Sequence, residues 1–154
     1  MKKQILNSLT TAFFLSLIIF ISCGDDDGPS GPTAAEAQFE LLAKTWSVTS
    51  ATADGSPVDG WTDLTITFGG TATAGTYTTN GMQPDGTSLV WPTSGTRTWT
   101  FESEENVNTI NRNDGVAISL AVDANQATLN FSIVDNSGRT DIVEGAWRFV
   151  LSPQ

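Results

Sequence analysis

The chain has 154 residues, with 7 Lys and Arg against 17 Asp and Glu, and a formal net charge of -10. This length fits one domain and a short additional segment. With no His and a single Cys, the sequence excludes a Ser-His-Asp triad, a His-ligated metal and an internal disulfide. The acidic balance argues against nucleic-acid binding, which requires Lys and Arg to neutralise phosphates. We therefore expect no enzymatic activity, no cofactor, no metal and no nucleic-acid partner.

The first 22 residues have the pattern of a signal peptide. Lys2 and Lys3 precede an apolar run from Ala12 to Ile21, interrupted only by Ser16. A run of this length matches a signal-peptide core and falls short of the ~20 residues that a membrane-spanning helix needs. We interpret residues 1–22 as a segment that directs export.

Ser22-Cys23-Gly24 resembles a bacterial lipobox, although Phe20 stands where Leu is commoner. The resemblance implies cleavage before Cys23 and acylation of that cysteine, and two or three acyl chains anchor a protein stably to a membrane. The alternative is an ordinary secretory segment in which Cys23 is incidental. A membrane is thus the first expected partner, reached through the lipid anchor.

Three acidic residues, Asp25, Asp26 and Asp27, follow the cysteine directly. They resemble the acidic export signal of Bacteroidetes lipoproteins, which implies the outer face of the outer membrane. The alternatives are a solvated acidic linker and a periplasm-facing anchor. Because the next residues are rich in Gly and Pro, residues 23–34 are expected to link the anchor to a folded domain at 35–154.

One short helix is expected at the start of this domain. Thr33 is a suitable N-cap, and Glu36, three residues later, completes a capping box. The residues from Ala34 to Lys44 are good helix formers. The pattern therefore predicts a helix of about three turns.

From Trp46 onward the apolar residues alternate with polar ones, which predicts strands. The expected strands are Trp46–Thr52, Leu64–Phe68, Thr71–Thr79, Arg97–Glu102, Val107–Arg112, Val116–Val122, Leu129–Ile133 and Thr140–Leu151. Short loops join most of them, which favours an all-β, eight-stranded antiparallel up-and-down barrel. A β-sandwich is the alternative fold. The long segment from Asn80 to Gly95 is expected to be a functional loop.

Several short motifs resemble the lipocalin-like lipoproteins of Bacteroidetes, across residues 38 to 152. They include Leu41–Val58, Trp91-Pro92, Arg112 with Asp114-Gly115, and Glu144-Gly145 with Trp147. The resemblance implies a lipocalin-like (calycin) barrel and no particular activity. Lipocalins carry Gly-x-Trp on the first strand, with an Arg laid across that Trp. Lys44 replaces the Gly here, and the resemblance implies that Trp46 and Arg148 form the structural pair at the barrel base.

Large aromatic side chains on the inward positions are candidates for lining a ligand pocket. The candidate residues are Tyr77, Trp91, Trp99, Phe101, Phe131, Trp147 and Phe149. Arg97 shares the face of Trp99 and is expected to anchor a carboxylate or sulfate inside the barrel. We expect either a carrier of a small, mostly apolar ligand or a filled barrel with a structural or adhesion role. The interior volume distinguishes the two.

Two further groups of residues are candidate sites. Trp61 and Trp91 lie near turns and are expected either to line a barrel mouth, where they could stack on a sugar, or to cover a loop. Glu102, Glu104 and Glu105 are expected to form a solvated turn, since nothing near them suggests the burial that raises a catalytic pKa.

Overall fold

The computed structural model describes residues 31–92, 97–134 and 144–154. Cys23 and Asp25 to Asp27 lie outside these residues. The described chain forms one helix, α1 (Ala34–Leu42), and nine strands. The strands are β1 (Thr45–Ala53), β2 (Ser56–Pro57), β3 (Thr65–Gly70), β4 (Gly75–Asn80), β5 (Arg97–Phe101), β6 (Thr109–Arg112), β7 (Ala117–Val122), β8 (Ala127–Ile133) and β9 (Gly145–Pro153).

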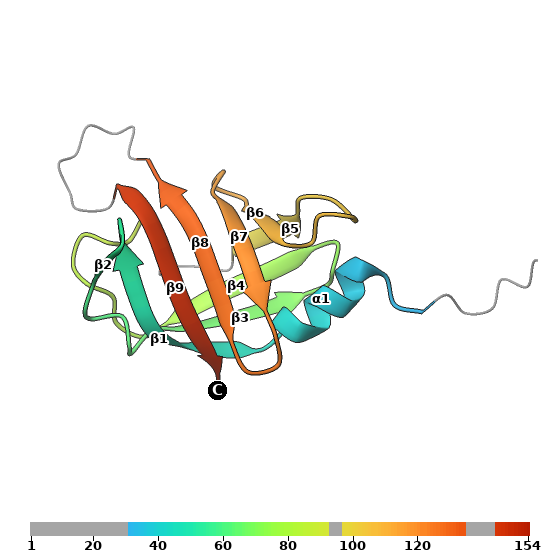
Figure 1. The fold of residues 1–154 in the computed structure, drawn as a ribbon, viewed down its shortest axis with the longest axis horizontal. Coiled ribbons are helices and arrows are strands. Elements are labelled where there is room, and N and C mark those ends of the chain that lie inside the picture. Colours follow the sequence, from blue (N-terminus) through green and yellow to red (C-terminus); the bar gives the residue numbers. More distant parts are fainter. Residues whose placement is uncertain (1–30, 93–96, 135–143) are drawn as a thin grey trace, which may run out of the picture.

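The strands form a closed antiparallel barrel (Figure 1). Each long strand pairs with the next along the chain, and β9 returns to pair with β1. This last pairing runs from Trp46 opposite Pro153 to Ala53 opposite Trp147. Since it joins the first and last long strands, the sheet has no open edge in its main body. The predicted eight-stranded up-and-down barrel is confirmed, and the β-sandwich is excluded.

The predicted helix is confirmed with its capping box. The Thr33 amide donates to Glu36 Oε2 at 2.8 Å, and the Glu36 amide donates to Thr33 Oγ1 at 3.1 Å. The helix ends at Leu42, two residues earlier than predicted, and the Trp46 indole Nε1 donates to the Leu42 carbonyl at 2.9 Å. This bond ties the end of α1 to the beginning of β1.

Most strand boundaries agree with the alternation, and the differences have local causes. The strand predicted from Thr71 starts at Gly75, because Thr71 and Ala74 hydrogen-bond to each other and close a turn. Ser56 and Pro57, which lie between the first two predicted strands, form the short strand β2 against Thr52 and Ala53. The last strand was predicted from Thr140, and residues 140–143 lie outside the described part of the chain.

The barrel has two ends with different closures. At one end lie α1, the β3–β4 turn, the β5–β6 connection and the β7–β8 turn. At the opposite end lies the segment that connects β4 to β5, in which Val90 and Trp91 are fully buried. Each end of the barrel is therefore covered by its own part of the chain.

Candidate functional site

The inside of the barrel is filled by aromatic rings. Trp91 comes from the β4–β5 segment, and its ring centroid lies 5.8 Å from Tyr77, 5.4 Å from Phe131 and 5.7 Å from Phe149. Phe149 also lies 4.9 Å from Trp61, which enters from the β2–β3 segment. Edge-to-face contacts at these distances are favourable ring geometries. A small apolar ligand would have to displace side chains that already pack against each other.

All seven aromatic ligand candidates are buried. They are Tyr77, Trp91, Trp99, Phe101, Phe131, Trp147 and Phe149, and none is more than 9% exposed. Trp61 and Trp91, expected either at a barrel mouth or over a loop, are 1% and 0% exposed. Neither ring offers a face on which a sugar could stack. The candidates come together as predicted, but as a packed core.

Among the residues that the structure describes, the fully buried charged side chain is Arg112, which was not among the predicted site residues. Its guanidinium lies 5.3 Å from the Trp91 ring and 5.9 Å from both Tyr77 and Phe131. Arg112 lies two residues after Ile110 on β6, so both side chains are on the same face of the strand, and both are buried. This period of two was a sequence pattern that could have identified Arg112 as an inward residue.

The Arg112 side chain binds backbone carbonyls of the β4–β5 segment. Nη1 donates to the Val90 carbonyl at 2.7 Å, and Nη2 donates to the Leu89 carbonyl at 3.5 Å. Nε donates to Asp114 Oδ1 at 3.0 Å, and Nη2 also pairs with Asp114 Oδ2. Buried charges require such pairing. Arg112 therefore holds Trp91 in the barrel end.

The surroundings of Arg112 shift the pKa values of two neighbouring groups, Tyr77 and Asp114. Burial raises the pKa of the Tyr77 hydroxyl above its ordinary value, and the Arg112 charge only partly offsets this. Partial burial acts to raise the pKa of Asp114, but the hydrogen bonds and charge of Arg112 outweigh it and lower that pKa. Asp114 is thus held as the anion that neutralises the buried Arg112.

The strand register agrees with the inward face predicted for Arg97, and its role as an anchor for a carboxylate or sulfate stays a prediction. Arg97 lies opposite Tyr77 on β4 and is half-buried. Its Nε is buried and has no hydrogen-bond partner among the described residues. Among the described residues, Arg112 is the cation in ring contact with Tyr77, Trp91 and Phe131.

The expected pair of Trp46 and Arg148 is corrected. Arg148 is exposed on β9 and lies opposite Thr52, whereas Trp46 lies opposite Pro153 near the other end of the same strand pair. The cation over the Trp46 ring is Lys44, whose Nζ lies 5.1 Å from the ring centroid. Lys44 can reach the ring because it lies two residues before Trp46 on the chain.

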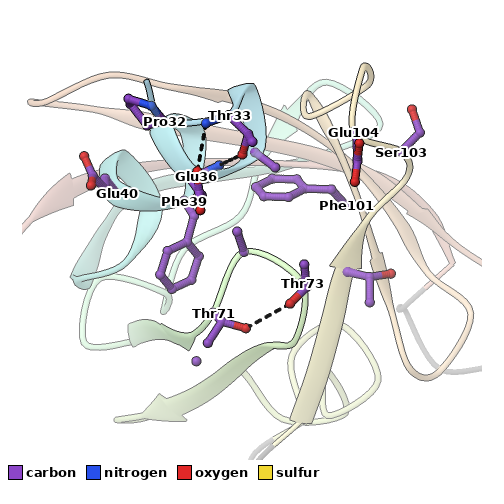
Figure 2. A pocket seen from close by; sticks show the side chains of 14 residues that line it. Pro32, Thr33, Glu36, Phe39, Glu40, Thr71, Thr73, Phe101, Ser103 and Glu104 are labelled. Atoms are coloured by element: carbon purple, nitrogen blue, oxygen red, sulfur yellow. Dashed lines mark hydrogen bonds between the residues drawn. The ribbon is translucent and has the colours of Figure 1, made fainter. Parts of the chain in front are cut away.

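A hollow of about 870 Å³ opens at the helix end of the barrel. We call it the α1 groove, and it lies between α1, the β3–β4 turn and the segment that follows β5 (Figure 2). Phe39 of α1 and Phe101 of β5 provide its aromatic surface, with Ala35 and Ala72 beside them. Glu36, Glu40 and Glu104 provide carboxylates. Sequence reasoning missed this groove because its three walls come from separate parts of the chain, each about thirty residues from the next.

Other kinds of site receive no support in the described ranges. No group of three or more Cys, His, Asp or Glu that could hold a metal ion occurs there. No helix among these residues is both long enough and apolar enough to cross a membrane. Comparison with protein-family models, with curated proteins and with solved structures found no match.

Proposed function

We propose that this protein is a lipid-anchored, lipocalin-like protein of the cell envelope that binds a small, mostly apolar ligand in the α1 groove. The observation that carries this proposal is the contrast between the packed barrel interior and the open groove beside α1. The barrel interior is occupied by Trp91 and its ring contacts, whereas Phe39 and Phe101 line an open hollow. Its volume is within the ~300–1,000 Å³ of small-molecule sites.

The position of the tether supports this assignment. Pro32 and Thr33, where the described chain begins to enter the domain, line the groove. If Cys23 is acylated, the roughly ten residues up to Thr33 can reach at most about 35 Å from the membrane. The groove would then lie close to the membrane surface, where apolar and amphiphilic molecules concentrate.

The test compares a filled groove with a matched control. Ala72 is half-buried in the groove wall, so Ala72→Trp would fill the groove. Ala121 is exposed on β7 and outside the groove, so Ala121→Trp adds the same ring elsewhere. The full chain would be purified from envelopes, denatured, and its released small molecules identified by mass spectrometry.

We expect a stoichiometric small molecule with the wild type and Ala121→Trp, and its loss with Ala72→Trp. Equal recovery from both variants would contradict the groove as the site. An empty wild-type protein would favour the second candidate, a structural or adhesion module. That alternative is supported by the packed interior, which gives a rigid barrel.

A further inference from the structure

We propose that the ligand of the α1 groove is an amphiphilic cation, with an aromatic or alkyl body and one ammonium or amidinium group. This inference rests on the proposed function and adds the chemical class of the ligand. It follows from the charges around the groove and from the nature of its floor.

The charges that line the groove are all negative. Glu36 and Glu40 lie on α1, and Glu104 follows β5 on the opposite side (Figure 2). No Lys or Arg is among the described residues that line the groove. Within the part of the chain that the structure describes, Glu40 and Glu104 form neither an ion pair nor a side-chain hydrogen bond. Their charge is therefore free to attract a cation.

The positive N-terminal end of α1 opposes the negative charge of the groove, but its effect is smaller than that of the carboxylates. A helix end carries about half a positive charge, and α1 begins beside the groove at Ala34. Glu36 is in this first turn and accepts the Thr33 amide, so it already counters the dipole. The two remaining carboxylates leave the groove with a net negative charge.

The floor of the groove is apolar and suits an apolar ligand body. Phe101 is 9% exposed, and Phe39 is half-buried with its ring centroid 6.2 Å from Trp99. In Figure 2 the Phe101 ring lies between Glu36 and Glu104. A ligand body on these rings places its head group near the carboxylates, and a cation there also gains from the ring faces. An anionic head group would be repelled.

The experiment uses three probes with one body and different head groups: phenylpropylammonium, phenylpropanol and phenylpropanoate. The full chain would be held in lipid nanodiscs and titrated calorimetrically, with empty nanodiscs subtracted. We expect the ammonium probe to bind about fivefold tighter than the alcohol, the size of an exposed charge interaction, and the carboxylate probe to bind weakest. Added salt should reduce the preference.

Two variants that each remove one negative charge test whether Glu104 causes the preference for the ammonium probe. Glu104→Gln should weaken the ammonium probe about threefold and leave the alcohol unchanged. Glu105→Gln removes the same charge next to it, at an exposed residue outside the groove, and should change neither. Equal binding of all three probes, abolished by Ala72→Trp, would overturn the cation inference and retain the groove. No binding, or binding that Ala72→Trp leaves intact, would overturn the proposed function itself.

Discussion

Removal of the Arg112 guanidinium should destabilise the barrel. The guanidinium joins Asp114 to the Leu89 and Val90 carbonyls in a buried position. Arg112→Met keeps an apolar stem but removes the cation beside the partly buried Asp114 carboxylate and the donor to the Leu89 and Val90 carbonyls. We expect the free energy of unfolding to fall by about 2–4 kcal/mol, measured by urea denaturation.

The matched control is Arg148→Met, because Arg148 is exposed on β9. Surface changes of this kind usually stay within about 0.5 kcal/mol. A similar small loss for Arg112→Met would show that the contacts of Arg112 do not hold the β4–β5 segment.

The lowered pKa of Asp114 makes the same contact sensitive to acid. An unfolded Asp titrates near pH 4, whereas folded Asp114 stays ionised to lower pH. Its contribution to stability is therefore present above about pH 4 and is lost as pH falls through the folded pKa. The stability difference between wild type and Asp114→Asn should shrink between pH 5 and pH 2. A difference that stays constant over this range would rule out the ion pair as its source.

The alternation of apolar and polar residues made the strands predictable from the sequence. The packing of the barrel interior was not predictable, because it depends on contacts between residues far apart in the chain. Trp99 and Phe101 were correctly assigned to one face, because side chains on a strand alternate with a period of two. The same rule would have placed Arg112 inward. The insertion of Val90 and Trp91 could not be read from local pattern, since it depends on carbonyls that meet Arg112 more than twenty residues later.

Close packing between strands predicts a sharp difference between two glycines of the β3–β4 hairpin. A Cβ at Gly75 would overlap the Trp99 indole, whereas a Cβ at Gly69 would lie 3.6 Å from Thr76 Oγ1, an ordinary contact. Gly75→Ala should therefore cost about 1–3 kcal/mol through overpacking. Gly69→Ala should be near neutral. Equal thermal unfolding of the two variants would argue against the tight β4–β5 packing.

At the scale of the whole molecule, export and anchoring stay predictions from residues 1–34. Cys23→Ser should move the protein from the membrane fraction to the soluble fraction, because it removes the site of acylation. Fractionation followed by immunoblotting would measure this, with the wild type as reference. Retention of the variant in membranes would remove the argument that the α1 groove lies near the membrane surface.

The central claim is that ligand binds at the α1 groove and leaves the barrel interior packed. Methyl NMR of the chain titrated with phenylpropylammonium tests this most directly. Ala35 and Ala72 report on the groove, and Ile118 and Leu129 report on the buried interior. We predict shifts at the two groove alanines with the interior methyls unchanged. Shifts of Ile118 and Leu129 that exceed those of the alanines would place the ligand inside the barrel and contradict the account.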